Sequence, residues 1–187
     1  MIKSILASRL PSLKTLNIKR LGDFPDIIAK NELADHIAEN YPFSIVADQN
    51  YSVYVGVGNY VGSSAYYVLY VKFGNETDLL PNAILGTPSS LQPLYEYRFS
   101  IQDSMNWESL LNFSVSNASI QGNNSQINTL QINGVTFNVD KPATWDSNST
   151  TVTYQLLFEL WLYNSSSGAV SFNDRFVDLQ LNLTRTM

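Results

Sequence analysis

The chain of 187 residues contains no cysteine, so disulfide bonds and thiolate metal sites are excluded. Disulfides are common in secreted eukaryotic proteins, and a cysteine-free domain outside the cell is more typical of a prokaryotic surface. Charged residues are also scarce, at 14% of the sequence against an average of about 25%. No apolar run reaches the roughly 18 residues of a membrane span. The sequence therefore indicates a folded domain whose surface is wetted mainly by neutral polar side chains.

Basic charge is missing from the larger part of the chain. Residues 50–187 hold five Lys and Arg against ten Asp and Glu, and this segment accounts for the whole net charge of −5. A protein that binds nucleic acid presents a basic patch to the phosphates. The charge distribution therefore excludes a nucleic-acid partner.

Histidine is nearly absent as well. The only one, His36, lies before the segment in which a β pattern begins, and we interpret it as an ordinary surface or packing residue. Without Cys or His, residues 41–187 cannot hold a zinc site, a cysteine nucleophile or a Ser–His triad. We expect no cofactor and no enzymatic activity.

What the chain has in excess is asparagine followed two residues later by Ser or Thr. Eight such N-glycosylation sequons occur, where random placement in residues 50–187 would give roughly three. They are Asn50, Asn75, Asn112, Asn117, Asn123, Asn148, Asn164 and Asn182. We predict that the chain is N-glycosylated and that it lies outside the cell or on its surface.

The segment 1–40 is predicted to form a partly helical extension. Residues 1–22 carry five Lys and Arg and no acid, with apolar residues at spacings near three and four, which is typical of an amphipathic helix. Such a helix could lie on a membrane surface, or the segment could be an ordinary terminal extension. A second helix is expected from Asp23, which can cap it, to Asn40, because Pro42 ends it.

From Tyr41 onward the apolar residues recur at every second position, which is the period of a β-strand. Tyr51–Val57 and Tyr95–Ile101 show this alternation clearly. Asn133-Gly134 separates two further runs and supplies the two positive φ values of a type I′ hairpin turn. We count seven to nine strands, so residues 41–187 are predicted to form an all-β, antiparallel, immunoglobulin-like β-sandwich.

The sequons fit this strand pattern. Asn112 and Asn182 each lie between two apolar residues of a strand, so their side chains are expected on the opposite, exposed face. Four others fall at predicted turns or loops: Asn75, Asn123, Asn148 and Asn164. A glycan needs an exposed side chain, and the two patterns agree on which side chains are exposed.

Seven aromatic-rich words stand out in the sequence: Ala38–Phe43, Tyr66–Phe73, Pro88–Leu91, Pro93–Tyr95, Trp145–Ser147, Phe158–Tyr163 and Arg175–Val177. These words resemble the C-terminal domain of an uncharacterised archaeal membrane-protein family, over roughly residues 36–187. The stretch Tyr51–Gly62 with the strand after it is also similar to the opening of small immunoglobulin-like domains of prokaryotic surface proteins.

Members of that archaeal family typically place several transmembrane helices before a β domain outside the cell. The resemblance therefore implies an extracellular β domain, but it implies no known activity and carries over no catalytic residue. Residues 1–35 do not resemble the membrane helices, and Leu10-Pro11-Ser12 interrupts any signal peptide. Either the chain is a fragment of a longer protein, in which case we expect it to be membrane-attached, or its sequons are unused.

Two carboxylates adjoin tryptophans: Glu108 follows Trp107, and Glu159 lies two residues before another. A pair of acids can hydrolyse a glycosidic bond when the carboxyl groups lie about 5 to 9.5 Å apart. Neighbours along a strand point to opposite faces, so Glu108 does not share a face with Trp107. We interpret Glu159 as a structural ion-pair partner of Arg98 or Arg175.

Four further acids lie at loops or strand ends: Asp140, Asp146, Asp174 and Asp178. Calcium requires several such oxygens to converge. None of the local spacings matches a calcium-binding loop, so no metal site is predicted.

Aromatic residues make up 12% of the chain. Most are expected in the core, but an exposed row of rings can stack on sugars, and Tyr54, Tyr60, Tyr66 and Tyr70 are candidate members. We expect a non-enzymatic surface domain for envelope architecture or protein contact, with protein or glycan partners at the cell surface. The alternative is a carbohydrate-binding module, which requires exposed rings that line up on one sheet face.

Overall fold

The computed structural model describes residues 16–20, 43–144 and 151–184, and every regular element within these ranges is a β-strand. The strands are β1 (Leu16–Arg20), β2 (Phe43–Ile45), β3 (Tyr51–Asn59), β4 (Ala65–Asn75), β5 (Tyr95–Ile101), β6 (Met105–Gln121), β7 (Asn124–Ile132), β8 (Val135–Thr144), β9 (Thr151–Asn164) and β10 (Ala169–Thr184). The all-β prediction is confirmed for this part of the chain.

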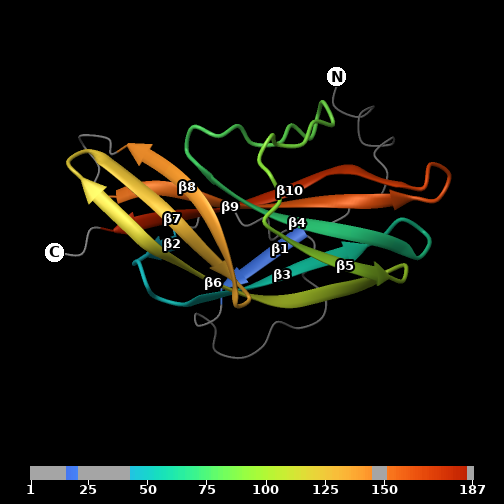
Figure 1. Cartoon of the computed structure of the whole chain (residues 1–187). Helices are drawn as coiled ribbons and strands as arrows, with labels where there is room; N and C mark the ends of the chain where they lie inside the picture. The colour runs from blue at the N-terminus through green and yellow to red at the C-terminus, as the bar shows by residue number, and fades with distance from the viewer. Residues whose placement is uncertain (1–15, 21–42, 145–150, 185–187) are drawn as a thin grey trace, which may run out of the picture.

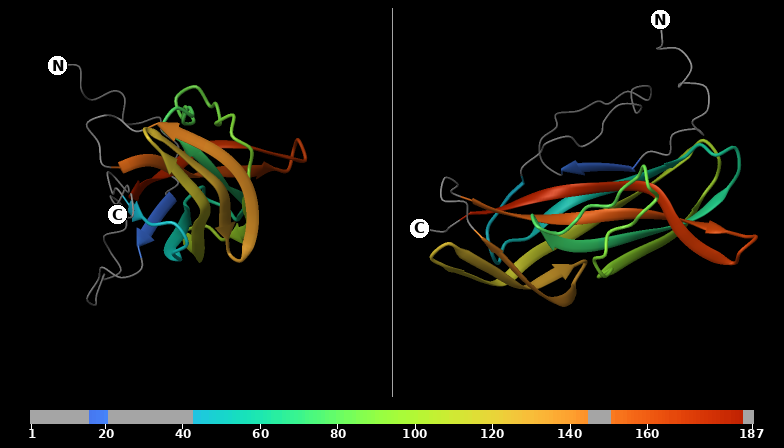
Figure 2. Two further views of the ribbon diagram at one scale, coloured as in Figure 1. Left: turned by 60° about the vertical axis from the view of Figure 1, so that its left-hand side comes forward. Right: turned by 90° about the horizontal axis from the view of Figure 1, so that it is seen from above.

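Nine of the strands, β2 to β10, form the two layers of a sandwich (Figures 1 and 2). Sheet 1 has the order β3-β6-β7-β8, and sheet 2 has the order β2-β10-β9-β4-β5. β1 pairs with the remaining edge of β3 in sheet 1. The predicted sandwich is confirmed, and the outer face of each sheet is the one turned away from the other sheet.

One strand pair departs from the predicted antiparallel arrangement. β2 runs parallel to β10, with Phe43 opposite Leu181 and Ile45 opposite Leu183, so sheet 2 is mixed. Parallel neighbours cannot be joined by a tight turn, and these partners lie near opposite ends of the described chain. No local sequence pattern marks such a pairing. Ile45 is fully buried, so β2 contributes to the core despite its three residues.

The alternation that predicts the strands also selects the core. The inward side chains of the three central strands are buried: Val53, Val55, Val57, Tyr67, Leu69, Val71, Leu156, Phe158 and Leu160. Burial of each such aliphatic or aromatic side chain contributes roughly 1.5–3 kcal/mol. The side chains that alternate with them point to the outer faces of the two sheets.

Two tyrosine hydroxyls join the sheets inside the core. Tyr67 of β4 donates to Asn59 Oδ1 of β3 (2.8 Å), and Tyr154 of β9 donates to Ser125 Oγ of β7 (3.0 Å). Burial raises the pKa of both phenols. They remain protonated donors at neutral pH, which satisfies polar groups that would be costly to bury alone.

The turn between β7 and β8 confirms a specific sequence prediction. Ile132 is opposite Val135, and the two residues between them have positive φ values, 48° at Asn133 and 82° at Gly134. A type I′ turn requires this left-handed backbone at both positions. The register of β7 against β8 therefore follows from the Asn-Gly pair.

The predicted N-terminal helix is wrong where the structure describes it. Leu16–Arg20, the end of the expected amphipathic segment, is strand β1, and it pairs antiparallel with Val53–Val57. The open edge of β3 offers a row of backbone donors and acceptors, whereas a short isolated helix is marginal in water. The other residues of 1–22 and the helix expected over 23–40 lie outside the described residues.

Within the described ranges no helix is long and apolar enough to cross a bilayer.

Candidate functional site

Glu108 and Glu159 lie on the outer faces of different sheets. Trp107 stacks on Phe99 in the interior, with ring centroids 3.8 Å apart, so its neighbour Glu108 points outward from sheet 1 and is exposed. Glu159 lies on β9 in sheet 2 and is fully buried. The body of the sandwich separates the two carboxylates, which excludes them as a glycosidase pair.

Glu159 is the centre of a buried polar cluster on the outer face of sheet 2. Its Oε2 lies 2.7 Å from Lys72 Nζ and accepts a hydrogen bond from Trp161 Nε1 (3.3 Å). Its Oε1 accepts from Ser89 N (2.9 Å) and Ser89 Oγ (2.6 Å). Lys72 is 3% exposed and Glu159 0%. Removal of two charges from water is costly, and this full set of partners offsets the cost.

The expected structural ion pair is therefore present, but its partner is Lys72. Arg98 instead pairs with Glu96 on the exposed surface of β5, with Nε 2.6 Å from Oε1. Hydrogen bonds to Glu96 raise the pKa of Arg98 further above its usual value, so it stays charged. Arg175 donates to the backbone oxygen of Asp174 (2.9 Å).

Ser89 belongs to the long connection 76–94 between β4 and β5. This connection, green in Figure 1, stands over the outer face of sheet 2. At its start the side chain of Asn75 forms an Asx turn, with Oδ1 accepting from Thr77 N (2.9 Å) and Asp78 N (3.1 Å). Lys141 Nζ of β8 then holds Asp78 Oδ2 at 2.8 Å. The connection is thus bonded to the sandwich near its start, through Asp78, and again in its second half, through Ser89.

The tip of the connection is a closed turn. Asn82 and Thr87 exchange two backbone hydrogen bonds of 2.8 and 3.0 Å. Asn82 Oδ1 also accepts from the backbone of Ile84 and Leu85, both at 3.0 Å. Gly86 adopts φ 65°, a left-handed value that suits glycine. The turn therefore presents its side chains in a fixed arrangement.

These side chains are apolar and exposed. Ile84 is 94% exposed, Leu79 81%, Leu85 75% and Leu80 43%. We call these four residues the aliphatic loop. Single exposed leucines are common on protein surfaces, but here two exposed aliphatic side chains lie on the fixed turn and two lie just before it. Such a concentration of exposed apolar residues is of the kind that marks a contact site.

Aromatic rings gather beside the aliphatic loop on the same outer face. Tyr66 contacts Tyr163 with ring centroids 6.1 Å apart at 85°, Tyr70 contacts Trp161 at 5.5 Å and 77°, and Trp161 contacts Phe172 at 6.1 Å and 59°. We call these five residues the aromatic patch. Tyr163 is 43% exposed, and the other four are half-buried.

Two of the four predicted aromatic candidates belong to this patch, namely Tyr66 and Tyr70. Tyr54 lies on β3 in sheet 1, opposite Leu110, and Tyr60 lies just after that strand, 38% exposed. The rings on sheet 2 pack edge to face, because three of their contacts have interplanar angles of 59° to 85°. They do not form one flat platform for a sugar chain.

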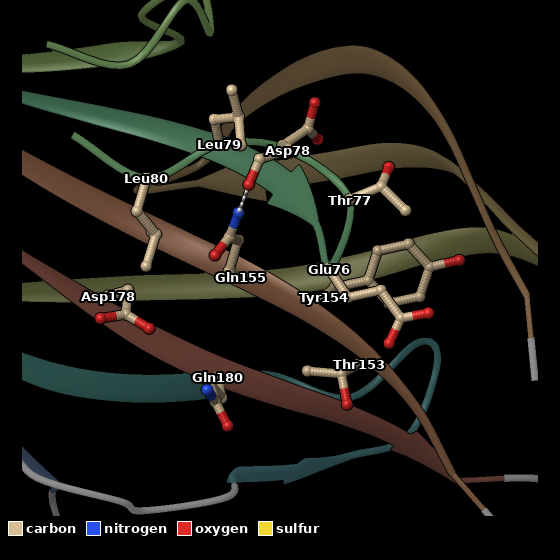
Figure 3. A pocket seen from close by; sticks show the side chains of 10 residues that line it. All are labelled: Glu76, Thr77, Asp78, Leu79, Leu80, Thr153, Tyr154, Gln155, Asp178 and Gln180. Carbon is tan, nitrogen blue, oxygen red and sulfur yellow. Dashed lines mark hydrogen bonds between the residues drawn. The ribbon is translucent and has the colours of Figure 1, made fainter. Parts of the chain in front are cut away.

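A groove of about 310 Å³ lies at the start of the 76–94 connection (Figure 3). Leu79 and Leu80 of the aliphatic loop form one side, and Glu76 and Asp178 add carboxylates. Gln155 Nε2 donates to the backbone oxygen of Asp78 (3.3 Å) across it. The groove places acidic side chains next to the aliphatic loop.

The acids considered for calcium do not converge. Asp140 lies on β8 in sheet 1, whereas Asp174 and Asp178 lie on β10 in sheet 2. Within the described ranges no group of three or more His, Asp or Glu could hold a metal ion. Asp146 and His36 lie outside the described residues.

The sequon asparagines are spread over the surface and do not form one site. Five are exposed: Asn50, Asn112, Asn117, Asn123 and Asn164. The first four lie on or beside strands of sheet 1, and Asn164 lies at the tip of the β9–β10 hairpin, which projects at one end of the molecule (Figure 2). Asn182 is half-buried and accepts from Thr153 Oγ1 (3.1 Å). Asn148 lies outside the described residues.

Asn75 differs from the exposed sequons. It is 9% exposed, and its Nδ2, the atom that would carry a glycan, donates to Pro142 O (2.7 Å). Its Oδ1 is used in the Asx turn that starts the 76–94 connection. A structural role explains this asparagine, so we expect it to be unmodified in the folded chain.

The residues that sequence reasoning missed are Lys72, Ser89 and the aliphatic loop. Lys72 had a visible signal, because it is the one charge in the apolar run Tyr66–Phe73, and a charge in a buried strand needs a partner. Leu79, Ile84 and their neighbours are apolar residues in a segment that contains three prolines. That composition predicts a loop but not the exposure of its leucines.

Comparisons with known proteins add no identity to this geometry. No family model matches the chain, and no curated protein matches it. The resemblance to an archaeal membrane-protein family stays a prediction.

Proposed function

We propose that this chain is a non-enzymatic binding domain of a cell surface, and that its contact surface is the aliphatic loop with the aromatic patch. The observation that carries the proposal is the fixed turn that exposes Ile84 at 94% and Leu85 at 75% beside half-buried rings. A protein partner that covers these side chains would remove a large apolar area from water, which favours association. The domain would serve envelope architecture or protein contact.

The exposed sequons of sheet 1 support the same surface, whereas Asn164 and Asn182 lie on strands of sheet 2. The residues of the aliphatic loop and the aromatic patch include no sequon, while Asn112, Asn117 and Asn123 are exposed on sheet 1. Glycans at those positions would cover the opposite side of the molecule and leave the contact surface open. Glycosylation also fits the low charge content, because sugars can supply solubility that ionic groups do not.

The sandwich resembles an immunoglobulin domain in one sheet. In that fold the sheet order is C-F-G, with F and G the last two strands, and sheet 2 places β4, β9 and β10 in this order. The other immunoglobulin sheet has the order A-B-E-D. Strand E, which lies beside B there, is the last strand before F in the chain. Sheet 1 instead has β6 beside β3, followed by β7 and β8. An immunoglobulin-like classification therefore rests on sheet 2, while the proposed archaeal family rests on the sequence words alone.

Peptide mapping of the chain purified from its native host tests the proposed location outside the cell. We expect glycans at several exposed sequons, including Asn112 and Asn117, and an unmodified Asn75. Asn75 provides an internal control, because it has the sequon but not the exposure. A chain with no modified asparagine would overturn the proposed location outside the cell.

Site-specific photo-crosslinking in the host tests the contact surface. A photoreactive amino acid at position 84 should crosslink to protein in intact cells, and the same group at Leu110, an exposed leucine on sheet 1, should not. Equal crosslinking from both positions, or none from position 84, would show that the aliphatic loop is not the contact surface.

A carbohydrate-binding module is the second candidate. It is favoured by the rings that gather on one sheet face next to the exposed Glu96–Arg98 pair. The steep angles between the rings limit stacking to single sugar units at Tyr163 or Trp161. Titration with cellobiose, maltose and chitobiose, with tryptophan fluorescence as the readout, tests for sugar binding. Quenching in the wild type that Trp161→Ala abolishes would favour this function over protein contact.

A further inference from the structure

We propose that the partner of this surface is a second copy of the chain, and that the aliphatic loop of each copy packs on the aromatic patch of the other. The inference rests on the proposed function, because it names the occupant of that contact surface. It follows from the position of the two apolar groups side by side on one outer face, and from the acidic residues around the loop.

The connection that carries the aliphatic loop is anchored on β9, the strand that also carries part of the aromatic patch. The 76–94 connection is tied to this strand at Glu159 through Ser89, and the aromatic patch begins two residues further on, at Trp161, and continues to Tyr163. Figure 1 shows the connection rising from the outer face of sheet 2, with the β9–β10 hairpin extending beyond it. One outer face thus carries a protruding aliphatic group next to a lower aromatic surface.

Such a face is complementary to itself. When two copies meet face to face, a twofold axis that lies across the strands, between the loop and the patch, sets each loop on the partner's patch. A twofold interface repeats every contact once and closes, so neither copy keeps an exposed loop. A one-sided contact would leave one aliphatic loop in water.

The area is sufficient for a stable pair. Three aliphatic side chains are at least 75% exposed, and Leu80 and Tyr163 are 43% exposed. With the half-buried rings, these side chains offer on the order of 800 Å² per copy, which is the area per partner of a standard protein interface. Their burial would occur on both sides of the twofold axis.

The acidic surroundings argue against a lipid surface. A Cβ at Gly86 would lie 3.2 Å from Asp174 Oδ1, and Glu76 and Asp178 line the groove beside Leu79. Residues 76–94 contain no Lys or Arg, the residues that attract a protein surface to anionic headgroups. These carboxylates would be repelled by anionic headgroups, whereas an aromatic protein surface has no such charge.

The proposed glycans are compatible with the pair. Asn112, Asn117 and Asn123 belong to sheet 1, which would face away from the interface. Asn164 lies beyond Tyr163 at the turn of the hairpin, at the rim of the aromatic patch. Sugars at these positions would surround the interface and not enter it.

Sedimentation velocity of the full chain over a wide concentration range tests the inference. The wild type should sediment as a pair at high concentration and dissociate on dilution to the 21.0 kDa monomer. The double variant Ile84→Asp/Leu85→Asp should stay monomeric with an unchanged thermal transition, because both side chains are exposed. The matched control Leu110→Asp, on the outer face of sheet 1, should associate like the wild type.

Several outcomes would overturn the second copy as the partner. One is a wild type that stays monomeric at every concentration. Another is loss of association in Leu110→Asp but not in the loop variant. A monomeric wild type that floats with phosphatidylcholine vesicles would assign the loop to a lipid surface. If the chain is monomeric yet position 84 still crosslinks to a different protein in cells, the second copy is excluded while the proposed contact surface stands. If position 84 also fails to crosslink, both fail.

Discussion

The outer faces of the two sheets are built from different side chains, although the same alternation fills the core from both. On sheet 1 many outward residues are small or polar, as in Gly56, Glu108 and Asn112, and Ser52 Oγ donates to Asn112 Oδ1 (2.6 Å). Tyr54 and Leu110 also lie on this face. On sheet 2 the outward residues include the aromatic patch and the buried Lys72–Glu159 pair. Two faces with equal access to solvent would not differ in this way.

The difference has a physical cause in one connection. Among the described residues, one long segment, 76–94, crosses an outer face, that of sheet 2, and it brings Ser89 to Glu159 with two hydrogen bonds of 2.9 and 2.6 Å. Without that cover, Lys72 and Glu159 would form a hydrated surface pair of little energetic value. With it, the pair is dry, and each partner depends on the other. Among the described residues, the outer face of sheet 1 carries no buried ion pair of this kind.

The largest expected effect comes from breaking the buried pair. Lys72→Met leaves the carboxylate of Glu159 buried without its cation, which should cost about 3–5 kcal/mol. Urea denaturation of both proteins measures the loss. The double variant Lys72→Met/Glu159→Leu should recover much of the stability, because replacement of both charges by apolar groups removes the unpaired one.

The exposed pair on the same sheet provides the control. Arg98, whose side chain is 52% exposed next to Glu96, should be replaceable by Met with a much smaller change in the urea midpoint. If Lys72→Met costs no more than Arg98→Met, the cluster around Glu159 is hydrated, and the contrast between the two faces is lost.

A smaller effect is expected at the hairpin turns of the two sheets. Gly134 in sheet 1 has φ 82° and Gly168 in sheet 2 has φ 68°, so valine is strained at both positions, by roughly 1–2 kcal/mol. We expect Gly134→Val to approach that cost, because a two-residue turn has no alternative. Gly168→Val should cost less, because the loop Ser165–Gly168 is longer and can adopt another form.

Urea denaturation of both glycine variants decides the point. Equal losses would mean that the longer turn of sheet 2 is as constrained as the type I′ turn of sheet 1. A neutral Gly134→Val would contradict the register of β7 and β8, since that register depends on the Asn133-Gly134 turn.

The features that the sequence predicts are local. Alternating residues such as Val53, Val55 and Val57 identify a strand because the period of two is a property of the backbone. Asn133-Gly134 identifies its turn because few residues tolerate two positive φ values. The expected sandwich, its long β9 strand and the outward position of Asn112 all follow from such short-range rules.

The features that escaped prediction depend on residues distant in the chain. Ser89 lies 70 positions from Glu159, and Phe43 pairs with Leu181, so no window of sequence contains either contact. The apolar spacing before β1 predicts a helix, because local spacing carries no information about the open edge of β3 with which this segment pairs. The exposure of the aliphatic loop was not predicted, because it depends on whether residues distant in the sequence cover this segment.

The smallest effect is expected from removal of residues 1–40, which tests whether the edges of the two sheets also differ. β1 adds backbone pairing to β3, but Val53 and Val55 of β3 face the interior and are buried there. Each edge hydrogen bond contributes a net of about 0.5–1.5 kcal/mol to the free energy of unfolding. The conformational entropy lost when the strand becomes ordered offsets most of this contribution. The chain 41–187 should therefore unfold in one cooperative transition, with a Tm lower by only about 2–4 °C for each kcal/mol lost.

The edge strand of sheet 2 should behave differently. Ile45 of β2 is fully buried, and Ile45→Ala should cost about 2–5 kcal/mol. Calorimetry of 1–187, 41–187 and the Ile45→Ala variant separates the two edges. A broad or absent transition in 41–187 would mean that β1 belongs to the folding unit, and that the boundary at residue 41 is misplaced.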